Sequence, residues 1–460
     1  MMRFSALPSM LIRVARFFVL ISVAGSIVFN VQNSATAQVP ETRPTPNAAQ
    51  SIPGVKPPAE EQPASESRPL YGVQGVLVET LDGETVATQS EHVPLNPASA
   101  VKLATALVAL QTFGPQHRFS TGVWSDGAFD KESGTINGNL YLSGRDPSFH
   151  YEHAILLARE LNRLGIKRVT GDLIVPPGFT MNFSWSARGS GEQLYVTFDA
   201  TLRSEAATRA WTYERTLLDD HASLESNPSV AVMGEVVVGN VSAAAKLLLT
   251  QKSSKLVDIL KVLLCYSNNF MAERIGETLG GPNSVQQQLV TKLGVDPEEL
   301  RLSSLSGLGI NRISPYVMMK IVRGLRIELE KQNLSPADIM PVAGIDPGTM
   351  KDRFTGLAWR GSVIAKTGTL VRTDGGASAL VGQMKTASGQ ELLFVIINQS
   401  GSVSRFRENQ DLFVMQIQNS RGGPKAFKYT PRQLAMELSD TEVRVSTSDE
   451  YETGSKLRSP

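Results

Sequence analysis

The chain has 460 residues, and its composition of 41% hydrophobic and 19% charged residues is typical of a globular protein able to build a core. Its length allows two domains or one large domain with an insertion. A formal net charge of +1 provides no field that would favour nucleic acid or an anionic membrane surface, so no nucleic-acid partner is expected. The single cysteine, Cys265, excludes an internal disulfide and lies in an apolar run where a buried side chain is expected.

The first 37 residues have the pattern of a secretory signal peptide. Arginines precede a mostly apolar stretch, Phe17 to Val31, which has signal length and is short for a membrane span. Small residues at Ala35 and Ala37 then favour cleavage before Gln38. We therefore expect export to the periplasm. The alternative is an uncleaved N-terminal anchor, which would leave the body of the protein in peripheral contact with the membrane.

A proline-rich stretch, residues 38–69, carries few large apolar groups and predicts an extended linker. The folded body then begins with a predicted strand at Val73 to Val78. A helix is predicted at Pro97 to Thr112, because a proline lies in its first turn and Gly114 follows its end. Before residue 176 the pattern also predicts strands at Ile136–Leu142 and Arg168–Val175 and a helix at His153–Leu164.

The pattern changes over residues 176–254, where Gly, Ser and Thr become frequent and helical periodicity fades. We interpret this stretch as an inserted β-rich subdomain that splits a catalytic domain into residues 70–175 and 255–425. The polar segment 439–460 is predicted to be a disordered tail. In the second half, helices are predicted at Leu256–Leu264, Asn269–Leu279 and Gln410–Ser420, and strands at Ser362–Leu370 and Glu391–Asn398. Strands at both ends of the body, with helices between them, predict an α+β fold with one sheet built from distant segments.

The first motif that carries chemistry is Ser99-Ala100-Val101-Lys102, near the start of a predicted helix. A spacing of three places the serine and the lysine on one helix face, one turn apart. A serine hydroxyl becomes a nucleophile when a base takes its proton, and a partly desolvated lysine loses its own proton readily enough to be that base. The helix start also favours developing negative charge at the serine. Alone, the motif also fits a solvated helix face.

The second motif is Ser267-Asn268-Asn269, at the junction of two predicted helices. Its hydroxyl and its amide, two residues apart, are expected to face one cleft. Ser267 would then relay a proton between Lys102 and the leaving group, and the Asn269 amide would hold a substrate carbonyl. Alone, the motif is also typical of an ordinary helix N-cap.

The third motif is Lys366-Thr367-Gly368-Thr369, on a predicted strand. A glycine inside a strand often marks a close approach to the backbone, here expected to be that of a substrate peptide. Lys366 would supply a cation for a substrate carboxylate and lower the pKa of the catalytic base, and Thr367 would bind the same carboxylate. The backbone N–H groups of Thr369 and Ser99 would form an oxyanion hole. Alone, the motif also fits a solvated edge strand.

In this order the three motifs form the set found in β-lactamases and penicillin-binding proteins. Over roughly residues 70–425 the chain resembles, more narrowly, the class C low-molecular-mass penicillin-binding proteins, the D-alanyl-D-alanine carboxypeptidase/endopeptidase family. The resemblance implies a transpeptidase-like or β-lactamase-like domain with an antiparallel sheet covered by helices. Further stretches that carry it are Pro97–Leu103, Gly138–Pro147, Gly171–Leu173, Ser306–Leu308, Asn311-Arg312 and Ser314-Pro315.

The chain departs from the family pattern at three places. The family usually has an aspartate in the middle of its second motif, where this chain has Asn268. The family usually has a further aspartate at the position two residues before the Ser306-Gly307 pair, where this chain has Ser304. The insertion between the first and second motifs is also short for the family. The nucleophile and both lysines are intact, so these departures bear on substrate preference and catalytic rate.

The resemblance implies a serine-type D-Ala-D-Ala carboxypeptidase or endopeptidase that acts on peptidoglycan stem peptides through a Ser99 acyl-enzyme. Peptidoglycan peptides are the expected partners, β-lactams are the expected covalent inhibitors, and no cofactor is expected. Two alternatives stay open. The same constellation could serve a β-lactamase or esterase, and Asn268 and Ser304 motivate a catalytically weak peptidoglycan-binding or regulatory protein.

Other classes of site lack support in the sequence. His150 and His153 are three residues apart, but no cysteine or further histidine lies near them, so no metal site is expected. The chain has no G-x-S-x-G nucleophile elbow, no phosphate-binding P-loop and no G-x-G-x-x-G fingerprint.

Overall fold

The computed structural model describes residues 72–217, 227–434 and 438–446, all within the unit of the chain that spans residues 68–460. The expected signal peptide (1–37) and nearly all of the expected linker (38–69) precede residue 68, and both lie outside the described residues. Within the described ranges, no helix combines the length and the apolar character needed to cross a bilayer.

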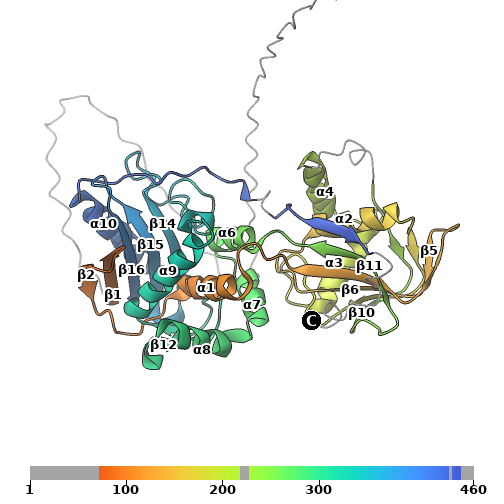
Figure 1. Cartoon of the computed structure of the whole chain (residues 1–460), viewed down its shortest axis with the longest axis horizontal. Helices are drawn as coiled ribbons and strands as arrows, with labels where there is room; N and C mark the ends of the chain where they lie inside the picture. Colours follow the sequence, from red (N-terminus) through yellow and green to blue (C-terminus); the bar gives the residue numbers. More distant parts are fainter. Residues whose placement is uncertain (1–71, 218–226, 435–437, 447–460) are drawn as a thin grey trace, which may run out of the picture. The chain divides into compact units, whose positions relative to one another are not determined.

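An antiparallel sheet with the strand order β14-β15-β16-β1-β2 forms the centre of the part of the molecule that carries the three motifs (Figure 1). β1, the first strand in the sequence, pairs with β16, which lies near the end of the body, so the two ends of the body meet in one sheet as the sequence predicted. β14 lies at the edge of the sheet and carries the third motif. The bounds are β1 (Val73–Thr80), β2 (Thr85–Gln89), β14 (Val363–Leu370), β15 (Ala377–Lys385) and β16 (Glu391–Gln399).

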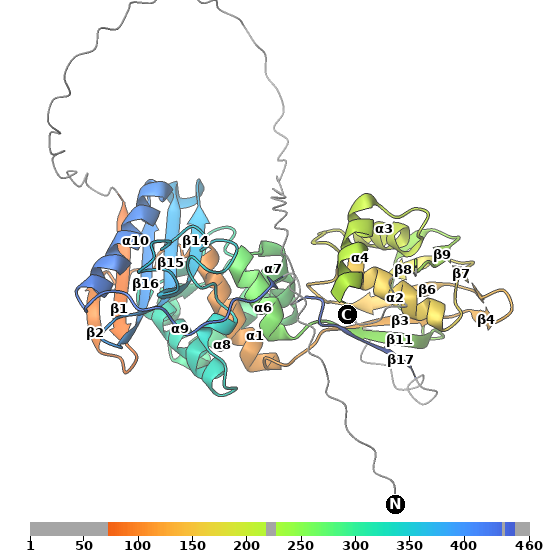
Figure 2. The same ribbon diagram turned by 90° about the horizontal axis from the view of Figure 1, so that it is seen from above.

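Helices cover both faces of this sheet (Figure 2). Side chains alternate along a strand, so the neighbours Leu393 and Phe394 of β16 enter different cores. Phe394 packs with Val414 of α10 (Val403–Asn419), whereas Leu393 joins a larger cluster that includes Cys265, buried as expected. The helices of that larger cluster are α1 (Lys102–Phe113), α6 (Leu256–Tyr266), α7 (Asn269–Thr278), α8 (Gly281–Leu293) and α9 (Pro315–Glu330). Helices packed on an antiparallel sheet confirm the predicted α+β class.

A second, mixed sheet has the strand order β10-β8-β6-β3-β11-β17 and a hydrophobic core of its own. Its bounds are β3 (Ser120–Ser125), β6 (Leu140–Gly144), β8 (Leu173–Val175), β10 (Val236–Val238), β11 (Lys246–Lys252) and β17 (Glu442–Val445). A smaller sheet joins β4 (Ala128–Asp130), β5 (Thr135–Asn137), β7 (Arg168–Val169) and β9 (Ala231–Val232). Three helices lie with these strands, α2 (Tyr151–Arg163), α3 (Ala187–Phe198) and α4 (Glu205–Leu217). The short strand pair β12 (Leu300–Arg301) and β13 (Arg312–Ile313) instead packs in the core of the first sheet.

The sequence predicted that residues 176–254 form a β-rich insertion, and the structure differs from this in secondary structure and in strand pairing. It contains the helices α3 and α4, because packing of Leu194 and Phe198 in the core overrides the low helix propensity of glycine and serine. Its strands β10 and β11 pair with β8 and β3, which the sequence assigned to the catalytic segment 70–175. Within the predicted tail 439–460, β17 forms because β11 offers it hydrogen-bond partners. Such pairings join distant segments, so no local pattern encodes them.

A buried ion pair ties α6, which leads into the second motif, to the loop before β14. Lys261 Nζ donates to Asp346 Oδ2 at 2.7 Å, and both side chains are 0% exposed. The backbone oxygens of Ala337 and Met340 accept the other two hydrogen bonds of the ammonium, each at 2.8 Å. Asp346 accepts from the Tyr429 hydroxyl at 2.7 Å and from a backbone N–H. The pair is fully satisfied, which is the condition under which a buried charge is tolerated.

We expect Asp346→Ala to lower the free energy of unfolding by about 3–5 kcal/mol, because it leaves the Lys261 ammonium buried without its counter-charge. Urea unfolding followed by circular dichroism measures this loss. The matched control is Glu192→Ala, which breaks the exposed i,i+4 pair with Arg188 on α3 and should cost less than about 1 kcal/mol. Equal losses in the two variants would contradict the structural role of the buried pair.

Candidate active site

Ser99 lies in a short 3-10 turn, Ala98–Val101, that leads directly into α1. The sequence placed it on an α-helix, but the i, i+3 spacing still brings Lys102 to the same face because a 3-10 helix has three residues per turn. Lys102 Nζ donates to Ser99 Oγ at 3.0 Å. The serine is partly exposed, whereas its neighbours Ala98 and Ala100 are fully buried. The backbone around the hydroxyl is therefore fixed while the hydroxyl itself reaches the surface.

Lys102 is 0% exposed, and its ammonium donates hydrogen bonds to three acceptors. Besides Ser99, these are Asn269 Oδ1 at 2.7 Å and the backbone oxygen of Ser306. Burial lowers the pKa of Lys102 to about 7, against an opposing effect of the Glu273 carboxylate. A neutral amine keeps two donors and gains a lone pair, so it can accept the proton of Ser99 while it stays held by the other two groups.

The second motif spans the junction between α6 and α7. Ser267 ends α6 in the left-handed conformation, with φ 56° and ψ 41°, and its hydroxyl accepts from Lys366 Nζ at 2.8 Å. Asn268, where the family usually has aspartate, is the N-cap of α7 and accepts from the backbone N–H of Met271 at 3.0 Å. Asparagine and aspartate cap helices equally well, so this departure leaves the position of Asn269 intact.

The third motif lies on the edge strand β14. The sequence predicted that Lys366 would face a substrate carboxylate, but Lys366 is not among the residues that line the pocket. Its side chain is 0% exposed, and its ammonium donates to Ser267 Oγ and to the backbone oxygen of Thr367 at 2.6 Å. Burial, and secondly the positive charge of Lys102, hold the pKa of Lys366 well below its usual range. The sequence predicted that the charge of Lys366 would lower the pKa of Lys102. In the structure it is the charge of Lys102 that lowers the pKa of Lys366. A buried amine that prefers its neutral form is poorly suited to bind a carboxylate.

Two glycines hold the backbone of Ser99 in place. A Cβ on Gly368 would overlap the backbone oxygen of Pro97, so the close approach predicted at this glycine is that of the chain's own 3-10 turn. Gly307 has a φ of +93°, and a Cβ there would overlap the backbone of Ala98 and Ser99. β14 and the loop at Gly307 therefore both pack against the nucleophile's turn.

Ser304, the other departure from the family pattern, closes the loop that contains Gly307. Its hydroxyl donates to the backbone oxygen of Leu308 at 2.5 Å and accepts from the N–H of Gly307 at 3.1 Å. Asn311 Nδ2 donates to the same hydroxyl at 3.3 Å. A carboxylate could accept the last two bonds, so Ser304 keeps the local geometry with a neutral group.

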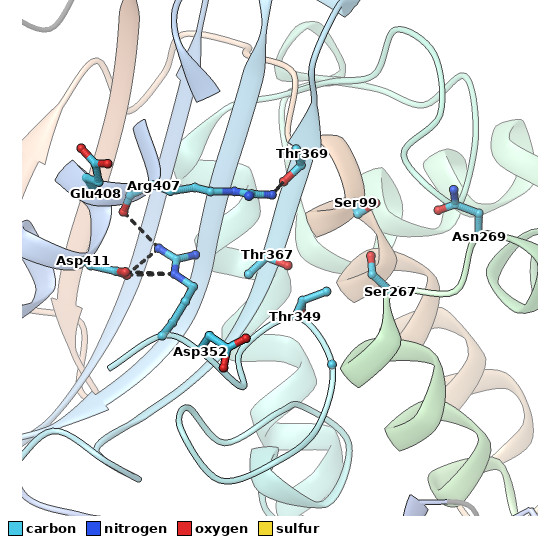
Figure 3. A pocket seen from close by; sticks show the side chains of 12 residues that line it. Ser99, Ser267, Asn269, Thr349, Asp352, Thr367, Thr369, Arg407, Glu408 and Asp411 are labelled. Atoms are coloured by element: carbon cyan, nitrogen blue, oxygen red, sulfur yellow. Dashed lines mark hydrogen bonds and ion pairs between the residues drawn. The ribbon is translucent and has the colours of Figure 1, made fainter. Parts of the chain in front are cut away.

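A pocket of about 640 Å³ opens above these residues (Figure 3). From the motifs, Ser99, Ser267, Asn269, Thr367 and Thr369 line it, whereas Lys102, Lys366 and Gly368 are not among its lining residues. The site residues predicted from the sequence therefore converge, with the two lysines buried behind their serines. Each lysine nitrogen lies within 3.0 Å of a serine hydroxyl oxygen.

The rest of the pocket wall carries charge that the sequence did not predict. It comes from the loop after Gly348 and from α10, and its charged members are Asp352, Arg353, Arg407, Glu408 and Asp411. Arg353 and Asp411 form an ion pair with nitrogen-to-oxygen distances of 2.5 and 2.9 Å. Arg407 Nη2 donates to Thr369 Oγ1 at 2.7 Å. These residues have no motif and no characteristic spacing, so only the folded structure identifies them.

Among the described residues, a group with the composition of a metal site lies outside this pocket, formed by His150, Glu152 and His153. The ring nitrogens of His153 are already engaged. Nδ1 accepts from the backbone N–H of His150 at 2.9 Å, and Nε2 lies 3.0 Å from the backbone oxygen of Leu438. The histidine therefore has a structural explanation, and the absence of a metal site stays a prediction.

Known proteins that are similar to this chain are carboxypeptidases and endopeptidases. A family model described as D-Ala-D-Ala carboxypeptidase 3 (S13) matches residues 67–185 and 204–418. The D-alanyl-D-alanine carboxypeptidase of Actinomadura sp. (strain R39) is 27% identical, with 79% of this chain and 83% of that protein covered. Carboxypeptidase DacB of Mycolicibacterium smegmatis is 26% identical, with 83% and 91% covered. The penicillin G-acylated endopeptidase Bd3459 of Bdellovibrio bacteriovorus superposes with a TM-score of 0.66 at 22% identity, over 78% of this chain and 96% of that one.

We expect Gly307→Ala to slow acylation of Ser99 by a fluorescent penicillin roughly 10- to 100-fold, because the added methyl must push the nucleophile's backbone aside. The labelling rate at a fixed probe concentration measures the effect. Gly309→Ala is the matched control, since Gly309 also has a positive φ, +86°, but a Cβ there meets only the Ser303 hydroxyl at 3.4 Å. Backbone strain alone would slow both variants equally, and that result would contradict the positioning role of Gly307.

Proposed function

The chain belongs to the D-Ala-D-Ala carboxypeptidase 3 (S13) family, and from that premise we propose that it is a serine-type D-Ala-D-Ala carboxypeptidase or endopeptidase of peptidoglycan stem peptides. The observation that carries the proposal is the pairing of Ser99 with the buried Lys102, whose pKa is about 7. A base with that pKa is neutral in about half of the molecules at neutral pH and can activate a hydroxyl there.

Acylation begins with the contact between Lys102 and Ser99. Neutral Lys102 takes the proton from Ser99, whose oxygen attacks the carbonyl carbon of the penultimate D-Ala. The backbone N–H groups of Ser99 and Thr369 bind the oxyanion that develops. The Ser267 hydroxyl, held by Lys366, gives its proton to the departing nitrogen and regains one from Lys102. The C–N bond breaks, the amine leaves neutral, and the acyl group stays on Ser99 as an ester.

Deacylation repeats the chemistry with water as the nucleophile. Lys102 takes a proton from the water, the water oxygen attacks the ester carbonyl, and Ser99 leaves with the proton returned to it. A β-lactam presents a cyclic amide to the same hydroxyl and acylates it in the same way. The related endopeptidase Bd3459 is known in a penicillin G-acylated form, which supports this part of the proposal.

The departures from the family pattern do not favour a catalytically weak protein. Asn268 caps α7, and Ser304 closes the Gly307 loop, so each has a structural task that its side chain performs. Ser99 is hydrogen-bonded to Lys102, and Ser267 is hydrogen-bonded to Lys366. Enzymatic activity is therefore the function that the site supports best.

The location of the enzyme follows from its substrate and from its N-terminus. We propose export to the periplasm, with residues 1–37 as the signal peptide and residues 38–69 as the linker to the folded body. Peptidoglycan lies outside the cytoplasm, so export would bring the enzyme to it. Retention of the first 37 residues as an anchor would give the same access from the membrane surface.

We expect the wild-type protein to bind a fluorescent penicillin covalently and to release D-alanine from peptides ending in D-Ala-D-Ala. Ser99→Ala should abolish both, because it removes the oxygen that forms the ester. Gel fluorescence and mass spectrometry of the products measure the two activities. Ser303→Ala is a control, since Ser303 lies outside the pocket lining. Labelling of Ser99→Ala at the wild-type rate would end the proposal.

The acylation rate should depend on pH through Lys102. Its pKa in the folded protein is about 7, below the usual 10.5, so the neutral base accumulates as the pH rises through about 7. We expect kcat/KM to fall about tenfold per pH unit below that value and to level off above it. D-alanine release at several pH values between about 5 and 9 tests this. A kcat/KM that still rises tenfold per pH unit at pH 9 would contradict a base with a pKa of about 7.

A further inference from the structure

The dipeptide Leu305-Ser306 carries the backbone oxygen that holds Lys102, yet it lies in neither a helix nor a strand. Its N–H and carbonyl groups therefore find no partners within a regular element, and side chains of two helices supply them instead. Thr105 of α1, which is buried, donates to the backbone oxygen of Leu305 at 2.7 Å. Lys102, one turn earlier in α1, donates to the backbone oxygen of Ser306. Both carbonyl groups of the dipeptide are thus held from α1.

Glu273 of α7 holds the two N–H groups of the same dipeptide. Its Oε1 accepts from the backbone N–H of Ser306 at 2.9 Å and from that of Leu305 at 3.2 Å. Its Oε2 lies 3.4 Å from the same nitrogen of Leu305. Hydrogen bonds from an N–H group to a carboxylate are roughly twice as strong as those between neutral groups. Side chains therefore fix every backbone N–H and carbonyl group of the dipeptide, and Glu273 holds both donors.

Asn269 lies one turn before Glu273 in α7, so the two side chains share a face of the helix. Asn269 Oδ1 accepts from Lys102 directly, at 2.7 Å. Glu273 instead acts through the backbone of Ser306, whose oxygen accepts from the same ammonium. Two of the three acceptors of Lys102 are therefore placed by α7, and the third is the hydroxyl of Ser99.

We propose that Glu273 is a positioning residue for the general base, Lys102. By holding two backbone N–H groups of the loop, it keeps the Ser306 oxygen where that oxygen directs the Lys102 nitrogen at Ser99. This inference rests on the proposed role of Lys102 in acylation. Glu273 belongs to none of the three motifs and is not among the residues that line the pocket, so it acts on the base and not on the substrate.

The charge of Glu273 gives it a second effect on the base. The neighbouring Arg274 pairs with Glu277 at 2.8 Å, and within the described ranges no ion pair includes Glu273. Burial lowers the pKa of Lys102 to about 7, and the Glu273 carboxylate opposes that effect. Among the described residues, the other charged group that interacts with Lys102 is the buried Lys366 of β14. Removal of the carboxylate should therefore favour the neutral amine and move its titration to lower pH.

The test measures the second-order rate constant for acylation of Ser99 by a fluorescent penicillin at several pH values between about 5 and 9. Glu273→Gln keeps an oxygen for both N–H groups but removes the charge. We expect its inflection to move down by roughly 0.5 to 1 pH unit, with a rate at high pH within about fivefold of wild type. The ratio of the variant's rate to the wild-type rate should then rise about three- to tenfold as the pH falls from about 9 to about 5.

Glu273→Ala removes both the charge and the acceptor. We expect it to slow acylation about 10- to 100-fold at high pH, because the Ser306 oxygen is no longer held against Lys102. Glu277→Gln is the matched control, since it removes the next carboxylate of the same helix, which pairs with Arg274. The rate and the inflection of this control should match those of the wild type.

The pH dependence separates an effect on the base from general damage, because damage lowers the rate by the same factor at every pH. If Glu273→Ala does not fold, as judged by circular dichroism, Glu273→Gln decides. An inflection at the wild-type pH in Glu273→Gln, or a wild-type rate in folded Glu273→Ala, overturns this inference and leaves the proposed function standing. A wild-type protein that is not acylated at Ser99 removes the proposed function and this inference together.

Discussion

The active site depends on keeping two lysine amines out of water while each touches a serine hydroxyl. Burying an ammonium costs several kcal/mol unless other groups replace the lost water. Asn269 and the backbone oxygen of Ser306 do so for Lys102, and Ser267 and a strand carbonyl do so for Lys366. The penalty that remains appears as the lowered pKa of both amines. The burial that disfavours the charged lysine is thus what suits Lys102 to the proposed role of base near neutral pH.

The contacting groups come from four separate segments of the chain, so their positions depend on close backbone packing. Gly307 and Gly368 allow a loop and a strand to lie directly against the turn that carries Ser99. Capping by Asn268 and the buried pair of Lys261 with Asp346 fix the end of α6, where Ser267 lies. A site built this way tolerates changes of side chain that preserve a hydrogen bond better than it tolerates an added methyl group.

Proton transfer and substrate recognition require opposite properties of a basic side chain. A general base must be neutral for part of the time, so burial suits it, whereas a group that binds an anion must stay charged and accessible. Lys102 has the burial that the first requires, and Arg407, an exposed arginine of the pocket wall, has the accessibility that the second requires. Arginine remains protonated even when its pKa is lowered, so Arg407 keeps its charge at pH values where Lys102 becomes neutral.

The sequence alone determined what depends on short spacing. The i, i+3 relation of Ser99 and Lys102 holds in a 3-10 turn as it would in an α-helix, and the apolar runs of β1 and β16 predicted their strands. The order of the three motifs identified the chemistry. Only the tertiary structure decided that Lys366 turns inward to Ser267, that Arg407 reaches Thr369, and that residues 176–254 share their sheet with earlier strands. Burial, pairing and pKa arise where segments far apart in the chain meet, and local sequence carries no record of those contacts.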